Sequence, residues 1–134
     1  MDATFHVAVD VDRDLVRTTL TGFFDAAAMR RYLDARAAAF RQLRCGPNEH
    51  LSLTDLREMM IQSQEMVGAF SATLADPAFR SRRLGFVIGS SLARMQLTRA
   101  LGGRLGANVR IFADMDAAEH WVLTGQDAPA APAE

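Results

Sequence analysis

The sequence predicts an α/β protein built on a mixed sheet of about five strands in roughly sequential order, with the first strand antiparallel at the edge and about four helices mainly on one face. Two alternating segments follow each other closely near the amino terminus, which predicts a hairpin. After Asp25, segments of helical periodicity alternate with short strand-like segments, and such strands pair in parallel through right-handed crossovers. The strands alternate rather than being apolar throughout, so we expect helices over one face only.

The predicted hairpin joins residues 5–11 to residues 15–23. FHVAVDV places apolar side chains at every second position, as a half-buried strand does. Residues 12–14 turn the chain into LVRTTLTGF, which alternates again and is rich in β-branched residues. Asp25 then caps the first helix, whose apolar stripe is Met29, Leu33, Ala37 and Phe40. Cys45, Gly46 and Pro47 form its stop signal.

Three strand and helix pairs follow, with the strands expected over residues 50–56, 84–90 and 108–112. The helix after the first of these strands is closed by Asp76 and Pro77, and the next begins at Ser90 or Ser91 and stops at Gly102. The last is a short helix, for which Asp116 and Glu119 have the spacing of a capping box.

The third strand should point Leu51 and Leu53 to the core, with its polar side chains outward. The face without helices is therefore expected to be polar. The side chains predicted to point outward or to lie on that face are His6, Asp10, Arg17, Thr19, His50, Ser52, Thr54 and Arg110.

A chain of 134 residues with 49% hydrophobic residues suffices for one domain with its own core. We expect this domain over residues 1–124 and a disordered tail over residues 125–134, which are small and dotted with prolines. The net charge of -1 argues against nucleic-acid binding. Cys45 has no second cysteine to pair with, and no stretch approaches the roughly 20 apolar residues of a membrane helix. We expect a cytoplasmic protein without membrane insertion.

The order of elements, the final VRIFADMDAAEHWV and the central strand followed by LTDLREMMIQSQEM resemble the STAS superfamily over roughly residues 5–123. The likeness is to anti-sigma-factor antagonists, and especially to antagonist-like bacterial proteins that share a fold with CRAL-TRIO lipid-transfer domains. It implies a small non-enzymatic regulator or ligand-binding module. In true antagonists a kinase phosphorylates the serine directly after the aspartate that ends the third strand. Asp55 matches that aspartate, but Leu56 and Arg57 stand where the serine would be, so the resemblance does not carry the switch over.

A small-ligand site is predicted around the helix starts. Ser63 either receives a phosphate or caps its helix, and the charge of Glu65 beside it favours capping. The segment GSSLAR lies where parallel sheets bind ligands, beyond the carboxyl ends of the strands. Capping and packing are the alternative roles of its residues. The candidate ligand or anion site consists of Asp55, Ser63, Gly89, Ser90, Ser91 and Arg94.

An apolar groove is the other candidate site, formed by Met59, Met60 and Met66, because methionine adapts its shape to varied ligands. Ordinary core filling is the alternative.

We expect no catalytic residue, cofactor or metal. The aspartates Asp10, Asp55 and Asp114 lack an assignable partner, the helix end at Cys45 makes its thiol less reactive, and His6 and His50 lack a third metal ligand.

These observations favour a non-enzymatic regulatory module that acts through protein contact, as a homodimer or with another protein. The alternative is a carrier or sensor of a small apolar or anionic ligand, held between residues 59–63 and the helix that starts at Ser90. An enzyme would need a pocket with converging ionisable groups, which the sequence does not indicate.

Overall fold

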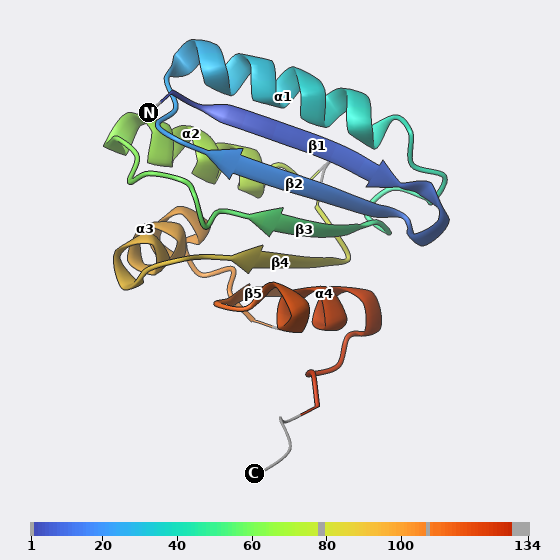
Figure 1. Cartoon of the computed structure of the whole chain (residues 1–134). Coiled ribbons are helices and arrows are strands. Elements are labelled where there is room, and N and C mark those ends of the chain that lie inside the picture. The colour runs from blue at the N-terminus through green and yellow to red at the C-terminus, as the bar shows by residue number, and fades with distance from the viewer. Residues whose placement is uncertain (1, 78–79, 107, 130–134) are drawn as a thin grey trace.

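The computed structural model describes residues 2–77, 80–106 and 108–129 and contains a five-stranded sheet in the order β1-β2-β3-β4-β5 (Figure 1). The strands are β1 (Thr4–Asp10), β2 (Leu15–Thr21), β3 (Leu51–Asp55), β4 (Arg83–Val87) and β5 (Val109–Phe112). β1 pairs antiparallel with β2, and each later pair is parallel. The predicted fold class, with its sequential order and antiparallel first strand, is confirmed.

The hairpin between β1 and β2 closes through one turn of 3-10 helix, Val11–Arg13. Asp14 follows with a φ of 51°, in the left-handed region that aspartate tolerates better than most residues. The backbone amide of Leu51 donates a 2.8 Å hydrogen bond to the Asp14 carbonyl. This bond places the start of β3 beside the start of β2.

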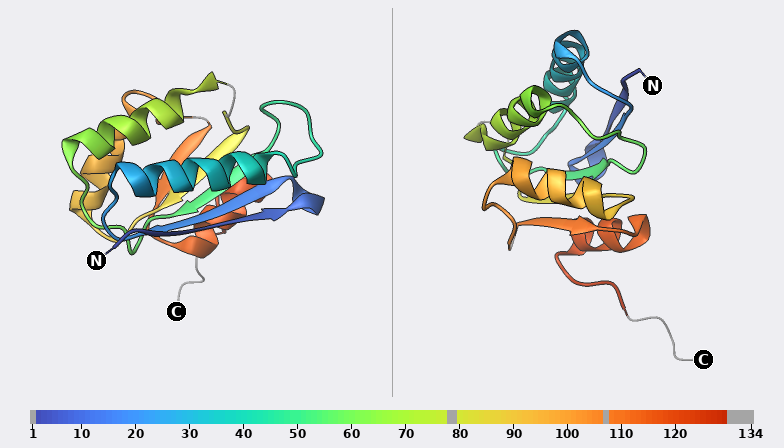
Figure 2. Two further views of the ribbon diagram at one scale, coloured as in Figure 1. Left: turned by 90° about the horizontal axis from the view of Figure 1, so that it is seen from above. Right: turned by 90° about the vertical axis from the view of Figure 1, so that its left-hand side faces the viewer.

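Three helices cover one face of the sheet, and the fourth lies on the other face (Figure 2). The first three are α1 (Ala26–Phe40), α2 (Gln64–Ala75) and α3 (Ser91–Leu101), and the fourth is α4 (Met115–Thr124). Asp25 caps α1 as predicted. The helix ends earlier than the predicted stop at Cys45, because the Gln42 amide already bonds to the Ala39 carbonyl in a tighter turn.

Each face of the sheet has its own core. On the face of α1, α2 and α3, Phe24 packs edge-to-face against Phe70 with ring centroids 5.5 Å apart. On the α4 face, Trp121 and Val122 pack against Leu51 and Leu53. The prediction of an uncovered second face is therefore wrong where α4 lies.

The side-chain directions of β3 are also the reverse of those predicted from its alternation. Leu51 and Leu53 face α4, whereas Ser52 and Thr54 share the other face with their β2 neighbours, Val16 and Thr18. Ser52, Thr54 and the adjacent His50 are buried rather than outward. β3 is the middle strand and is buried on both faces, so alternation alone cannot tell which side carries more helices.

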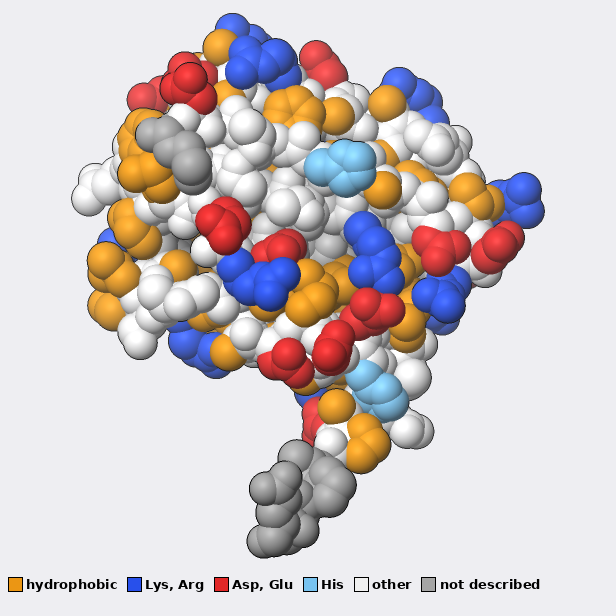
Figure 3. All heavy atoms as spheres, viewed as in Figure 1, with side chains coloured by type: hydrophobic (Ala, Val, Ile, Leu, Met, Phe, Trp, Pro, Cys, Tyr) orange, Lys and Arg blue, Asp and Glu red, His pale blue; other side chains and the backbone are white. Residues whose placement is uncertain are grey.

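The rest of the α4 face is polar, as expected. His6 and Thr19 are paired on it, and the Arg17 guanidinium lies 3.0 Å from the Glu119 carboxylate of α4. The Arg110 guanidinium stacks over the Trp121 ring at 4.8 Å. Basic and acidic side chains lie interspersed on this surface (Figure 3).

The carboxyl-terminal part differs in one detail from the expectation. Asp114, rather than Asp116, is the N-cap of α4 and accepts a hydrogen bond from the Ala117 amide. Residues 125–129 form no helix or strand, and residues 130–134 lie outside the described residues, so the disordered tail stays a prediction. No helix among the described residues is long and apolar enough to cross a membrane.

Candidate functional site

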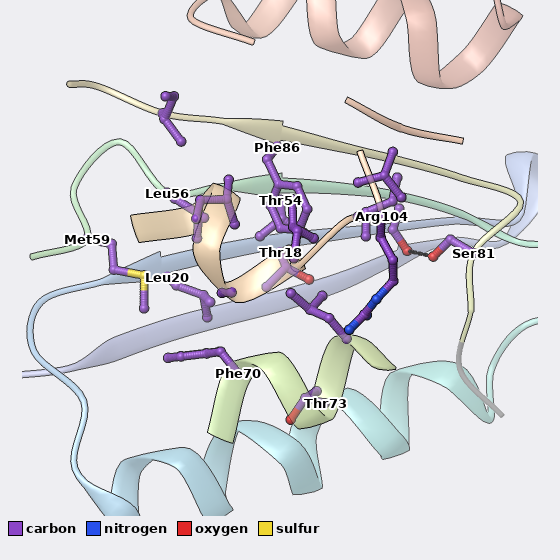
Figure 4. A pocket seen from close by; sticks show the side chains of 18 of the residues that line it. Thr18, Leu20, Thr54, Leu56, Met59, Phe70, Thr73, Ser81, Phe86 and Arg104 are labelled. Atoms are coloured by element: carbon purple, nitrogen blue, oxygen red, sulfur yellow. Dashed lines mark hydrogen bonds between the residues drawn. The ribbon is translucent and has the colours of Figure 1, made fainter. Parts of the chain in front are cut away.

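A cavity of about 320 Å³ lies between the sheet and the helices α1, α2 and α3 (Figure 4). The strands supply its floor, with Val16, Thr18 and Leu20 from β2, Ser52 and Thr54 from β3, Leu84 and Phe86 from β4, and Val109 from β5. These side chains share one face because paired strands hold them in register. Helices α2 and α3 supply most of the opposite wall.

The floor carries hydroxyl groups among apolar side chains. Thr18 and Thr54 are cross-strand neighbours, and neither hydroxyl bonds to another described residue. Ser52 is different, because its Oγ lies 2.7 Å from Ser81 Oγ. The floor therefore offers a few polar groups to a ligand within a mainly apolar surface.

The wall opposite the floor is more apolar. Phe70 and Leu74 of α2 face the cavity, together with Leu97 and Leu101 of α3. Thr73 uses its hydroxyl within the helix, where it donates to the Ala69 carbonyl at 2.9 Å. In Figure 4, Phe70 and Thr73 project from α2 on the opposite side of the cavity from Thr18 and Thr54.

The loop after β3 lines the cavity at the carboxyl end of the strands. Met59, Met60 and Ile61 all contribute to this lining, and Met60 is 45% exposed. The Met60 amide donates to the Gly22 carbonyl at 3.1 Å, which fixes the loop beside the end of β2. This is the arrangement expected of an apolar groove with a partly open entrance.

A buried amide, which the sequence analysis missed, holds this loop in place. Gln62 is 7% exposed, accepts from the Phe24 amide at 2.8 Å and donates to the Gly22 carbonyl at 2.9 Å. Gln96 of α3 accepts from the Gln62 amide and donates back to its carbonyl, at 2.7 and 2.9 Å. The entrance loop is thus bonded to both β2 and α3.

Positive charge gathers at the opposite end of the cavity, by the amino ends of β3, β4 and β5. Arg36 comes from α1, Arg80 and Ser81 precede β4, and Arg104 and Asn108 precede β5. Figure 4 shows Arg104 and Ser81 at one end, and Met59, Leu20 and Leu56 at the other. The cavity therefore has a charged end and an apolar end.

The charged end also contains a chain of hydrogen bonds. Ser81 Oγ, which bonds to Ser52, also lies 3.0 Å from His50 Nε2. Burial lowers the pKa of His50, and the charge of Arg36 lowers it further, while Asp14 acts in the opposite direction. This shift favours the neutral form of His50.

Burial also lowers the pKa of Arg36, although Tyr32 and Asp76 favour its charged form. Its guanidinium lies over the Phe40 ring at 4.7 Å, which supports a cation in a partly apolar setting. Arg36 therefore contributes positive charge to the cavity while interacting with groups of the chain itself.

The predicted ligand residues at the helix starts do not line this cavity. Ser63 and Ser90 are the N-caps of α2 and α3 and accept from the amides of Met66 and Ala93. Ser91 and Arg94 are exposed on α3. Ser63 therefore caps α2, which is one of the two roles predicted for it, and Ser90, rather than Ser91, caps α3.

Asp55 and Gly89, the remaining residues of the predicted ligand site, both lie beside Arg57 in the loop after β3. Asp55 binds the Arg57 side chain through both carboxylate oxygens, at 3.0 and 2.9 Å, and these hydrogen bonds hold the Asp55 pKa below its ordinary value. A Cβ on Gly89 would lie 3.1 Å from the Arg57 carbonyl oxygen. Close packing explains this glycine.

Among the groove candidates, Met59 and Met60 line the cavity and Met66 does not. Met66 is instead part of the core beneath α2, so its assignment to the groove is wrong. The first turn of the helix directs it inward, beside the cap at Ser63.

The groups considered for metal binding or catalysis are dispersed. His6 is exposed on β1, whereas the buried His50 packs on Phe40 with ring centroids 4.7 Å apart. Burial, followed by the charge of Asp14, raises the pKa of Cys45. Among the described residues there is no group of three or more histidine, cysteine, aspartate or glutamate side chains that could hold a metal.

The fold is that of an α/β module of the SpoIIAA-like type, which is the fold of STAS anti-sigma-factor antagonists. One solved structure with this fold is an uncharacterised protein of the DUF3478 family with a SpoIIAA-like fold, from Shewanella loihica PV-4. The two chains share 13% identity with a TM-score of 0.70, over 91% of this chain and 96% of that chain. No family model and no curated protein matched this sequence. The resemblance to the STAS fold is thereby confirmed.

Proposed function

We propose that this protein is a non-enzymatic carrier or sensor that holds a small, largely apolar molecule between its sheet and its helices. The observation that carries the proposal is the cavity of about 320 Å³, whose walls are mainly apolar with a few hydroxyls on the floor. Small-molecule sites typically combine an apolar lining with a few polar groups in this way.

The construction of the entrance supports the same function. Met59 and Met60 can adjust to ligands of different shape, because methionine is flexible and polarizable. Gln62 and Gln96 meanwhile bond the loop to α3, so the entrance keeps its position. A defined entrance with adaptable side chains suits a protein that takes up and releases a ligand.

Native mass spectrometry of the purified protein tests the proposal first, because it detects a retained small molecule.

A second test measures binding of the apolar dye Nile red and its displacement by decanol. Ala100→Phe fills the cavity from α3 and should abolish dye binding, whereas Thr98→Phe adds the same ring on the exposed side of that helix and should preserve it. Circular dichroism checks that both variants are folded. The proposal would be refuted if the purified protein retained no small molecule and bound neither Nile red nor decanol.

A second candidate function is regulation through protein contact, with a homodimer as the first partner to test. Its support is the antagonist-type fold together with Leu92 and Met95 of α3, which are 59% and 61% exposed. Light scattering should then show a dimer that Leu92→Gln and Met95→Gln weaken. A monomer at micromolar concentrations would leave the homodimer without support.

A further inference from the structure

We infer that the ligand of this cavity is an anionic amphiphile, whose carboxylate or phosphate lies at the end formed by Arg36, Arg80 and Arg104 and whose apolar tail points toward Met59. The inference rests on the proposed function and adds to it the chemical class of the ligand and its direction in the cavity. It depends on the distribution of charge along the cavity wall.

Charge in the lining has one sign only. Among the described residues, the lining includes Arg36, Arg80 and Arg104 but no aspartate or glutamate. Two aspartates outside the lining act on this end: Asp76 favours the charged form of Arg36, and Asp14 favours the charged form of His50. Neither Arg80 nor Arg104 forms an ion pair with a carboxylate of the described chain. The net charge at this end is therefore positive.

A cavity that is cationic at one end and apolar elsewhere favours a ligand with an anionic group and an apolar part. Placing guanidinium groups next to apolar surface costs solvation free energy, and an anion among them offsets that cost. Arginine suits this role because its planar fork of donors matches a carboxylate or a phosphate. A neutral apolar ligand would fill the cavity but would offer no negative charge to Arg80 and Arg104, which form no ion pair within the described chain.

Polar side chains beside the arginines add further hydrogen-bonding groups to the charged end of the cavity. Asn108 lies there in the lining, and Ser81 is held between Ser52 and His50 by hydrogen bonds of 2.7 and 3.0 Å. These bonds fix the position of the Ser81 hydroxyl. Because hydroxyl and amide groups hydrogen-bond to oxyanions, they complement the arginines without competing for the ligand charge.

The apolar part of the ligand has a defined path away from this end. The floor between the two ends presents Thr18, Thr54 and Phe86, and the far end presents Leu56 and Met59 (Figure 4). A strand the length of β3 spans roughly 15 Å, which is the distance that an extended tail lying along the strands would cover. The helix amino termini at Ser63 and Ser90 lie at the opposite end from the arginines, and their capping bonds already occupy the amides of Met66 and Ala93.

Titration calorimetry with decanoate, decyl phosphate, decanol and decylamine tests the inference, because these probes share a tail and differ in charge. Wild-type protein should bind the two anions at least about tenfold more tightly than decanol, and decylamine most weakly. Added salt should weaken the binding of the anions and leave that of decanol unchanged. Inorganic phosphate alone should bind far more weakly than decyl phosphate, since it lacks the apolar part.

Variants assign the effect to the arginines. Arg104→Gln should reduce decanoate affinity about tenfold while leaving decanol affinity unchanged. Arg80→Gln, at an exposed position that tolerates change, should act in the same direction, and Arg94→Gln on the outer side of α3 is the matched control with no effect. Melting temperatures without ligand check that each variant is folded.

Equal wild-type affinity for decanoate and decanol would overturn the inference, and so would arginine variants that bind decanoate as tightly as wild type does. Both results would leave the proposed function standing, since decanol would still bind. Failure of every probe to bind would remove the proposed function as well.

Discussion

Gln62 shows how a single residue can fix a functional loop. Its buried side chain satisfies the Phe24 amide and shares the Gly22 carbonyl with Met60. Gln62→Leu keeps most of the volume but leaves the buried Phe24 amide without its acceptor and the Gly22 carbonyl with the Met60 amide alone, so it should lower the free energy of unfolding by about 1 to 3 kcal/mol. Gln64→Leu is the matched control, because Gln64 is exposed two positions away and should change stability by less than about 0.5 kcal/mol. Urea denaturation measures both, and equal effects would contradict this role.

His50 gives the fold a dependence on pH. Its ordinary pKa is 6.5, and burial together with Arg36 lowers it in the folded state. The unfolded chain therefore binds the proton more readily, so the contribution of neutral His50 is complete above pH 6.5 and decreases as the pH falls toward the folded pKa. His50→Gln should flatten the fall in unfolding free energy over this range.

Nuclear magnetic resonance checks the same shift directly. The His50 ring should titrate below 6.5 in the folded protein. A midpoint at or above that value would mean that Asp14, rather than burial and Arg36, dominates its environment.

At the scale of elements, the helix starts divide into capping and non-capping serines. Ser90→Ala should destabilise the protein by about 1 kcal/mol, because the Ala93 amide loses its acceptor. Ser91→Ala alters the next residue, which is exposed and does not cap, and should have little effect. Thermal denaturation of the two variants tests this assignment, and a larger loss at Ser91 would contradict it.

The strands and helices were predictable because local patterns determine them. The alternation in β1 and β2, the cap at Asp25 and the glycine at Gly102 all act within a few residues of the element they define. The direction of β3 was not predictable in this way. Ser52 and Thr54 look like solvent-facing residues, and only the packing of α4 onto Leu51 and Leu53 turns them toward the cavity.

The site itself was predictable only in part. Met59 and Met60 were identified because flexible apolar residues in a loop indicate a groove. Arg36, Arg80 and Arg104 were missed, since they lie far apart in the sequence and converge only when α1 and the loops before β4 and β5 meet at one edge. No spacing rule connects such residues before the topology is known.

The sheet has a cavity on the face covered by α1, α2 and α3, and it is closely packed on the face covered by α4. Substitutions on the two faces should therefore change stability differently. On the α4 side, a Cβ on Gly85 would lie 2.7 Å from Val122 Cγ2, so Gly85→Ala should destabilise the protein by about 1 to 3 kcal/mol. On the cavity side, Thr54→Val replaces a hydroxyl that has no partner among the described residues, so it should leave stability unchanged or raise it slightly. Urea denaturation of the ligand-free protein measures both changes. A Thr54→Val loss as large as that of Gly85→Ala would mean that the Thr54 hydroxyl makes a hydrogen bond in the folded protein, which would contradict its assignment as a polar group available to a ligand.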